Sequence, residues 1–396
     1  MNFESKCDRW LLAVTLMLLG IGVLMVYSST SVVAPSPDKE SVSEYYYLKK
    51  HLFTLLLGFA VMFAASRVRP ETLRKLAIPI LAGSLVLLLL VFVPGLGVKA
   101  GGARRWIRLW PSTFQPSELV KLAMVIFLAW YVSREGFKRN RFAHFAVPVA
   151  IMGVFQVVFL KQPDFGAAMS LGVLTIGMLF LAGVPLRYLA SLFALCLPVL
   201  AKLLMEPYRF KRIMAFLDPW EHARDSGFQL VQSFIALGSG GLTGLGLGQS
   251  SQKLSFLPEV HTDFIFSLIG EELGFIVATM VVGLFAFAFI RGMIIANRAG
   301  EGFRYHLCVG LSLLIAFQAL VNFMVVVGLL PTKGLPLPFL SYGGSALLVN
   351  MAAVGILLNV SRLDPGEVES RRPQDAALEE LTRRKRARRS VYGAIR

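Results

Sequence analysis

The sequence predicts an all-α, polytopic integral membrane protein with about ten transmembrane helices and one long extracytoplasmic loop. Of its 396 residues, 56% are hydrophobic and only 16% are charged, and 30 are phenylalanine. A soluble domain of this length could not bury so much apolar surface. The second observation is that long apolar windows recur along most of the chain.

Each predicted helix is a window of about 18 or more mostly apolar residues, close to the length that crosses a bilayer. The windows are 10–32, 51–66, 76–98, 118–133, 143–160, 165–184, 187–206, 263–290, 306–330 and 343–361. The second window is short, and the fifth and sixth are divided only by the segment from Lys161 to Asp164. The first window is too long, and is followed by too many others, to be a cleaved signal.

The distribution of Lys and Arg predicts the orientation and the division of the chain. If the N-terminus is cytoplasmic, nearly every short basic loop is cytoplasmic too, as the positive-inside rule requires. We therefore expect a cytoplasmic N-terminus at 1–9, a membrane domain at 10–361 and a basic cytoplasmic tail at 362–396. The basic run from Arg383 to Arg389 favours topology or anionic lipids over nucleic acid as the reason for the charge.

The long outer segment at 207–262 has about 56 residues, which is too long for an idle connection. Residues 228–237 have the pattern of an amphipathic helix at the membrane interface. The run from Gly238 to Gly248 is rich in glycine but fits neither a dinucleotide fingerprint nor a phosphate loop. It indicates a close backbone approach or a hinge, and a simple flexible loop is the alternative.

Two outer segments oppose the positive-inside rule. One is the loop 99–110, with Arg105, Trp106 and Arg108, and the other begins at Pro207 and contains Arg209, Lys211 and Arg212. Guanidinium and ammonium groups there suit phosphate oxygens. The alternative is contact with lipid headgroups, assisted by the tryptophans as interfacial anchors.

Acidic residues in an apolar segment are the strongest sign of function. A carboxylate at mid-bilayer costs roughly 2.5–3.5 kcal/mol, yet the window at 263–290 contains Asp263, Glu271 and Glu272. On a continuous helix, Asp263 and Glu271 would lie about 80° apart, with Glu272 on the opposite side. We therefore expect at most one glutamate beside Asp263, and the other paired with a neighbouring helix.

The sequence does not require a cofactor. The five histidines and three cysteines are scattered without metal-ligand spacing. Whether a metal takes part is unknown from the sequence, and a divalent cation, Mg or Mn, is a possible aid.

Several motifs resemble the SEDS family, named for shape, elongation, division and sporulation. They are Phe216 to Trp220, Gly227 to Ser233, Gln252 to Glu259, His261 to Phe264 and Gly328 to Ser345. The resemblance covers essentially every predicted helix. Gln252 to Leu254 and Thr332 to Gly334 resemble the division members more than the elongation members.

The resemblance implies a peptidoglycan glycosyltransferase that polymerises lipid II, the undecaprenyl-pyrophosphate disaccharide-pentapeptide, with inversion. Asp263 matches the family's catalytic aspartate and would be the general base. Other polar positions with family counterparts, which we take as substrate-binding candidates together with the outer cations, are Arg105, Trp106, Glu118, Lys121, Asp164, Lys333, Ser341 and Ser345. Because Lys121 follows Glu118 by three residues, a local ion pair is the alternative for both.

The implied partners are the class B penicillin-binding transpeptidase FtsI, the FtsQ-FtsL-FtsB division complex and membrane lipids, with no nucleic acid. The implied location is the bacterial inner membrane at the division septum, with both termini cytoplasmic. A lipid II transporter is the alternative function, but it would need a polar path through both halves of the bilayer. A scaffold for division proteins would explain the tail but not the outer arginines.

Overall fold

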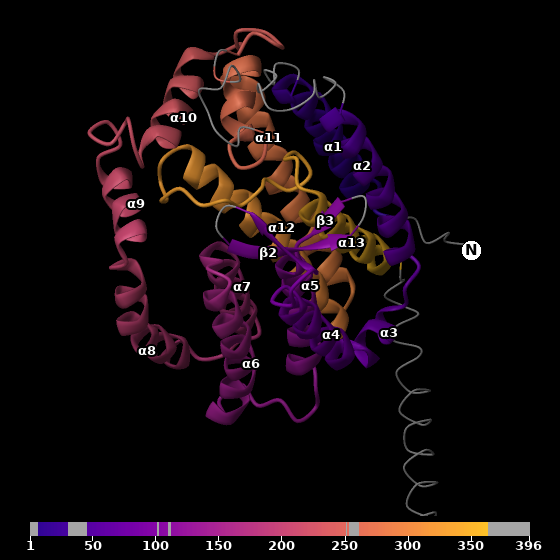
Figure 1. Ribbon diagram of the computed structural model, residues 1–396. Helices are drawn as coiled ribbons and strands as arrows, with labels where there is room; N and C mark the ends of the chain where they lie inside the picture. The colour runs from indigo at the N-terminus through magenta and orange to yellow at the C-terminus, as the bar shows by residue number, and fades with distance from the viewer. Residues whose placement is uncertain are drawn as a thin grey trace, which may run out of the picture.

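The structure is a computed structural model that describes residues 7–30, 46–100, 103–109, 112–250, 252 and 261–362. The basic tail from 363 onward and the approach to Asp263 at 253–260 lie outside the described residues. Within the described part the chain is mainly helical, as the sequence predicts (Figure 1).

Every apolar window of the sequence corresponds to a helix. These helices are α1 (Arg9–Thr30), α2 (Tyr46–Ala65), α4 (Ala77–Leu90), α5 (Pro116–Val132), α6 (Phe142–Lys161), α7 (Phe165–Leu181), α8 (Leu186–Leu204), α11 (Ile265–Arg298), α12 (Phe303–Val326) and α13 (Gly344–Ser361). Six of them, α1, α2, α6, α11, α12 and α13, are individually long and apolar enough to cross a membrane. The chain is therefore a multi-pass membrane protein.

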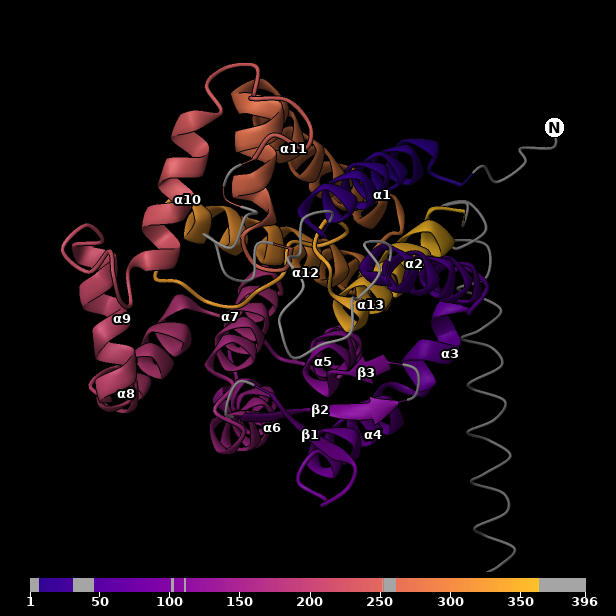
Figure 2. The same ribbon diagram turned by 45° about the horizontal axis from the view of Figure 1, so that its top comes forward.

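The centre of the bundle is formed by α5, α12 and α13. Most side chains of these helices are buried, and α5 packs against α4, α7 and α12. Helix α2 covers α13, and α11 covers α12 (Figures 1 and 2). Helix α8 lies at the side of the molecule and leaves Phe193 and Leu195 exposed, as expected for a face turned toward lipid.

The segment 99–110, expected to be a loop, instead belongs to a small antiparallel sheet. Its strands are β1 (Gly97–Ala100), β2 (Ala103–Leu109) and β3 (Ser112–Phe114), in the order β1-β2-β3. The pairing includes Val98 with Trp106 and Arg108 with Thr113. Hydropathy does not reveal such a sheet, because its strands are short and the central one contains three arginines. Trp110 lies outside the described residues.

The long outer segment begins with two helices. Helix α9 (Pro207–Leu217) was not expected, whereas α10 (Phe228–Ser239) confirms the predicted amphipathic helix. Leu230, Val231 and Ala236 are buried, and α10 packs on α11. The Ser233 hydroxyl donates to the Val326 carbonyl at the end of α12 over 2.9 Å. Earlier in the chain, a helix of six residues, α3 (Pro70–Lys75), follows α2.

The glycine-rich run makes the close backbone approach that was expected of it. It packs against a kink in α11 at Gly274, where φ is 81° and ψ is 176°. The Phe275 N–H donates to the Gly241 carbonyl over 2.9 Å, and the Leu245 N–H donates to the Glu271 carbonyl over 3.0 Å. The kink exposes backbone groups of α11, and the glycine-rich run satisfies them.

Candidate functional site

Asp263 lies in the turn immediately before α11 and is half-buried. Three successive carbonyls of this turn accept hydrogen bonds from the segment between α12 and α13 or from α12 itself. The Tyr342 N–H donates to His261 O over 2.8 Å, and the Ser341 hydroxyl donates to Thr262 O. The Asn322 amide of α12 donates to Asp263 O over 2.8 Å. The backbone under Asp263 is therefore fixed although it is not helical.

The helical geometry assumed for the three acids was wrong in one respect, because α11 begins only at Ile265. Glu272 is 1% exposed and accepts two contacts from the Ser28 hydroxyl of α1, at 2.7 and 2.6 Å. Glu271 accepts a hydrogen bond from Ser250. Glu272 thus has the predicted pairing with a neighbouring helix, and each glutamate is a buried acid with a hydroxyl donor.

The loop between α12 and α13 forms the wall beside Asp263. A Cβ added to Gly334 would be 2.9 Å from Asp263 Oδ2, so the carboxylate lies against the glycine backbone. Ser341 supports this loop as well, since its hydroxyl accepts the Leu337 N–H over 2.8 Å. The Ser341 hydroxyl therefore joins the Thr262 carbonyl of the turn to the Leu337 N–H of the loop.

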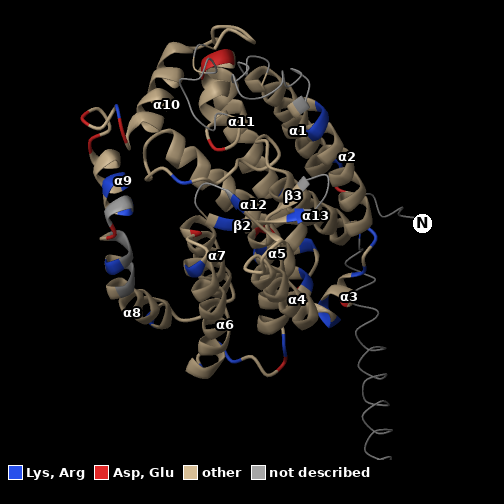
Figure 3. Cartoon of the chain, viewed as in Figure 1, with Lys and Arg blue, Asp and Glu red and all other residues tan. Residues whose placement is uncertain are grey.

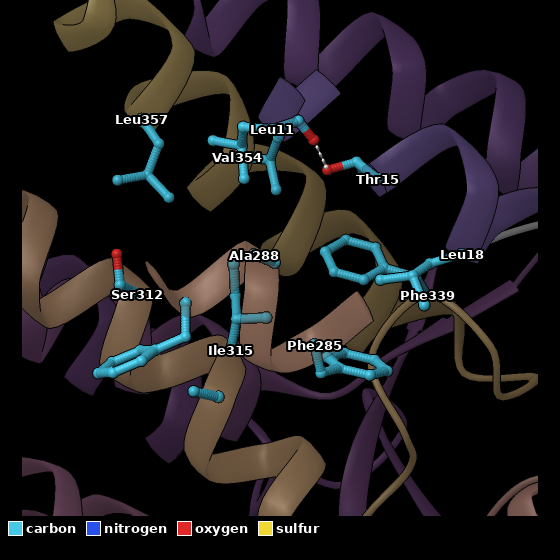
Figure 4. A pocket seen from close by; sticks show the side chains of 12 residues that line it. Leu11, Thr15, Leu18, Phe285, Ala288, Ser312, Ile315, Phe339, Val354 and Leu357 are labelled. Atoms are coloured by element: carbon cyan, nitrogen blue, oxygen red, sulfur yellow. Dashed lines mark hydrogen bonds between the residues drawn. The ribbon is translucent and has the colours of Figure 1, made fainter. Parts of the chain in front are cut away.

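Phe339 anchors the same loop inside the bundle. It lines an apolar cavity between α1, α11, α12 and α13 together with Leu18 and Phe285 (Figure 4). Its φ of 66° is uncommon for a residue with a side chain, so the surrounding packing must hold it. Part of that packing is Gly22, whose missing Cβ leaves room for the Phe339 carbonyl.

Cationic side chains gather at the start of α7, close to the loop that holds Gly334. Lys333 Nζ lies 4.7 Å from the Phe165 ring centroid, and the Arg209 guanidinium lies 5.3 Å from the same centroid. Arg212 Nη1 donates to the Thr332 carbonyl over 3.2 Å. Burial lowers the pKa of Lys333 from 10.5 to about 8. Lys211, also on α9, is exposed to solvent.

The sheet arginines differ in what they contact. Arg105 donates to the Pro163 carbonyl and, over 3.4 Å, to the Gln162 carbonyl at the end of α6. Arg108 is exposed, and Trp106 between them is half-buried. Figure 3 shows basic residues on β2, on α9 and on the loop between α12 and α13. Arg105 is therefore attached to the protein, while Arg108 is accessible to a ligand.

Asp164 and Ser345 connect the sheet to the start of α7 and of α13. Asp164 is the N-cap of α7 and accepts the Ala167 N–H over 3.1 Å. The Gln115 side chain donates to Asp164 over 3.3 Å, and the Gln115 N–H donates to the Ser345 hydroxyl over 2.8 Å. The structure thus places both predicted residues in one chain of hydrogen bonds through Gln115.

Glu118 and Lys121 form the ion pair that their spacing allowed. Lys121 Nζ lies 2.8 Å from Glu118 Oε1, and both side chains are almost fully buried. Gln318 donates to Glu118 over 3.3 Å, and Asn350 donates to Gln318 over 3.2 Å. These contacts make a polar cluster between α5, α12 and α13 that is separate from the turn of Asp263. A buried charge pair is stable only when further hydrogen bonds satisfy it, and Gln318 supplies one.

Three residues of the site are not predicted from the sequence: Asn322 and Gly334, which contact Asp263, and Phe165, which contacts Lys333 and Arg209. One signal was available for the first, since Asn322 is an amide within an apolar window. Among the described residues there is no group of three His, Cys, Asp or Glu side chains that could hold a metal ion. The arrangement is a half-buried carboxylate that lies against Gly334, in the loop that also carries Lys333.

Comparison with known proteins identifies the family of the chain. Residues 9–364 match the model of the FtsW, RodA and SpoVE family, which is described as cell cycle protein. A protein of Geobacter sulfurreducens named probable peptidoglycan glycosyltransferase FtsW is 46% identical over 362 residues, which are 90% of this chain and 96% of that protein. A Legionella pneumophila protein of the same name is 41% identical, with 90% and 91% covered.

Solved structures show the same fold. A chain from work described as structural coordination of polymerization and crosslinking by a peptidoglycan synthase complex has a TM-score of 0.74 and 28% identity, covering 90% of this chain and 98% of that one. The Thermus thermophilus rod shape determining protein RodA has a TM-score of 0.66 at 28% identity, with 90% and 97% covered. The chain therefore belongs to the cell cycle protein family of FtsW, RodA and SpoVE, the SEDS family that its motifs resemble.

Proposed function

We propose that this protein is a peptidoglycan glycosyltransferase of the FtsW type, which polymerises lipid II into glycan strands at the division septum. The observation that carries the proposal is the position of Asp263. Three successive carbonyls of its turn accept hydrogen bonds, and its carboxylate lies against Gly334, the residue after Lys333. The names of the relatives and the fold support the same reaction.

Asp263 would be the general base. Lengthening a glycan requires removal of a proton from the acceptor hydroxyl, and a positioned carboxylate contributes typically about 10²–10⁴-fold to such a step. The sugar of lipid II is α-linked to pyrophosphate and the glycan bond is β, so a single displacement inverts the anomeric carbon. One carboxylate is then sufficient, and no second acid has to reach the reacting carbon.

The cations would bind the pyrophosphate of the donor as it leaves. Lys333, Arg209 and Arg212 are brought together at the start of α7, and Arg108 is exposed on β2. Phosphate oxygens suit guanidinium forks, and an ammonium group adds a point charge. Binding would strengthen as negative charge moves onto the departing phosphate, which is how such groups accelerate a reaction.

A divalent cation would fit this site in one way. Mg²⁺ is commonly held by one or two carboxylates together with substrate phosphates rather than by a full set of protein ligands. Asp263 and a bound pyrophosphate would supply such a set, so any metal would arrive with the substrate. Its chemistry would be to neutralise charge on the leaving phosphates.

Partners and location complete the proposal. We expect a class B penicillin-binding transpeptidase, FtsI, to crosslink the strands, and the FtsQ-FtsL-FtsB complex to recruit the pair to the septum. The similarity to a chain from a peptidoglycan synthase complex supports a synthase partner. Both chain ends would be cytoplasmic, and Asp263 would face the periplasm, where lipid II is consumed.

The test is polymerisation of lipid II by the purified protein with and without its transpeptidase. Wild-type protein should form glycan strands, and Asp263→Asn, a near-isosteric change that removes only the base, should fold and bind lipid II but form none. Wild-type turnover by that variant would remove Asp263 from its role. Movement of lipid II across vesicle membranes without any polymer would favour the transporter.

A further inference from the structure

The hydrogen bonds of Asn322 are unusual for an amide in a membrane helix. Its Nδ2 donates to the Asp263 carbonyl and to the Leu335 carbonyl, each over 2.8 Å. The residue is 2% exposed and belongs to α12. One amide group therefore joins the turn before α11 to the loop that lies against the Asp263 carboxylate.

The second observation is the oxygen of the same amide. Asn322 Oδ1 is buried and has no hydrogen-bond partner among the described residues. A buried polar atom without a partner destabilises a fold, and an apolar residue of similar size would avoid that loss. The Asn322 side chain therefore contributes through the two hydrogen bonds that its Nδ2 donates, since its Oδ1 makes none with the described residues.

The two carbonyls that it joins stand on either side of the reacting group. One belongs to Asp263 itself, and the other follows Gly334, whose Cα faces Asp263 Oδ2. The turn is not part of a helix, so no helical hydrogen bond sets the distance between these segments. Ser341 and Tyr342 join the same loop to the turn at Thr262 and His261, whereas Asn322 makes the bridge at Asp263 itself.

We propose that Asn322 is a positioning residue for Asp263, which fixes the carboxylate relative to the Gly334 backbone by bridging the Asp263 and Leu335 carbonyls. This inference rests on the proposed glycosyltransferase function. Asn322 does not touch the reacting atoms and acts through the turn. Its loss displaces the base without removing it, and a displacement of about 1 Å can slow a reaction by roughly a hundredfold.

Asn350 provides a matched control one helix away. It is 1% exposed, its Nδ2 also donates twice, to Gln318 and to the Ala346 carbonyl, and its Oδ1 also lacks a partner. It has no contact with the turn of Asp263 among the interactions of the described residues. Replacing each asparagine by leucine therefore removes the same kind of group from the same depth.

The experiment compares Asn322→Leu and Asn350→Leu in full-length protein, with Asn322→Ser as a second variant in case the leucine variant does not fold. Hydrogen exchange would be measured on a peptide covering 261–268, where the Ser267 and Leu268 N–H groups donate to the Phe264 carbonyl. Loss of the bridge should accelerate exchange there by about tenfold or more in the Asn322 variants, because each lost hydrogen bond loosens the turn. The Asn350 variant should leave it unchanged.

Lipid II polymerisation is the second readout. Asn322→Leu should lower kcat by about ten- to a hundredfold with KM within about threefold, and Asn322→Ser, which retains one donor, should fall between it and wild type. Asn350→Leu should change kcat less than Asn322→Leu does, because Asn350 has no contact with the turn of Asp263 among the interactions of the described residues. Equal effects of the two leucine variants, or unchanged exchange at 261–268, would overturn the inference. If wild-type protein made no polymer, the proposed function would fail, and the exchange data would still decide whether Asn322 holds the turn.

Discussion

The carboxylate of Asp263 lies against the backbone of Gly334. A Cβ at position 334 would be 2.9 Å from Oδ2 and 3.7 Å from the carboxyl carbon of Asp263. Gly334 is exposed, so its lack of a side chain leaves the carboxylate open to a substrate. Gly334 therefore matters because it leaves space beside the carboxylate, and not because of an unusual backbone conformation.

Gly334→Ala should therefore impair catalysis more than stability. The added methyl group would push the carboxylate aside, and we expect kcat for lipid II polymerisation to fall by about a hundredfold, while thermal unfolding changes little. Steady-state kinetics and thermal unfolding of the same preparation would check this. Gly343→Ala is a suitable control in the same loop, because the nearest atom to its Cβ would be 3.5 Å away. Equal kinetics of the two variants would contradict the assigned role of Gly334.

Lys333 predicts a pH dependence. Burial lowers its pKa from 10.5 to about 8, so its ammonium group is charged below about pH 8 and neutral above it. If this charge binds pyrophosphate, kcat/KM for lipid II should fall as pH rises through about 8. Lys333→Arg, which stays charged, should remove this basic limb and leave the acidic limb in place. A limb that persists in the arginine variant would assign it to another group.

The same shift affects stability in the opposite direction. Because the folded-state pKa of Lys333 is below that of the unfolded chain, the unfolded state binds more protons between about pH 8 and 10.5. This residue therefore destabilises the fold below pH 8, and the loss is relieved as pH rises through that window. Between about pH 8 and 10.5, the contribution of Lys333 to activity should therefore fall while its contribution to the free energy of unfolding rises.

Replacing Arg105 should change the stability of the protein, whereas replacing Arg108 should change its kinetics. Arg105 donates to the carbonyls of Gln162 and Pro163, whereas Arg108 is exposed. We expect Arg105→Ala to lower the unfolding temperature by a few degrees, about 1 kcal/mol, because two carbonyls lose a charged donor. Arg108→Ala should leave the unfolding temperature unchanged and raise KM for lipid II. Unchanged kinetics with Arg108→Ala would favour contact with lipid headgroups.

The sequence predicts the helices far better than it predicts the residues that hold Asp263 in place. Apolar windows are reliable because every backbone polar group in a bilayer must be satisfied within the protein, which leaves helices as the main solution. The strands from Gly97 to Phe114 are too short and too charged to give such a signal. Asp263 was identifiable as an acid in an apolar segment, whereas Asn322 and Gly334 matter only through contacts that form between distant parts of the chain.

The kink in α11 could not be predicted from hydropathy either, since Gly274 is one small residue in a long apolar run. Its partner, the glycine-rich run, could be recognised as a backbone approach because no phosphate-binding pattern explained it. What it approaches depends on the fold. Gly244 lies so close to α11 that a Cβ there would be 2.2 Å from the Glu272 carbonyl oxygen.

Gly244→Ala should consequently destabilise the protein severely. The methyl group would overlap backbone atoms that cannot rotate away, and φ at this position is 83°, which also disfavours alanine. Gly241→Ala is the matched control, because Gly241 has a φ of 54° but no atom within 4 Å of the added Cβ. We expect about 1 kcal/mol of destabilisation in the control, from the backbone conformation alone. Thermal unfolding in detergent should show a much larger loss for Gly244→Ala. Equal losses would mean that the glycine run is needed only for its backbone angles and not for its contact with the kink.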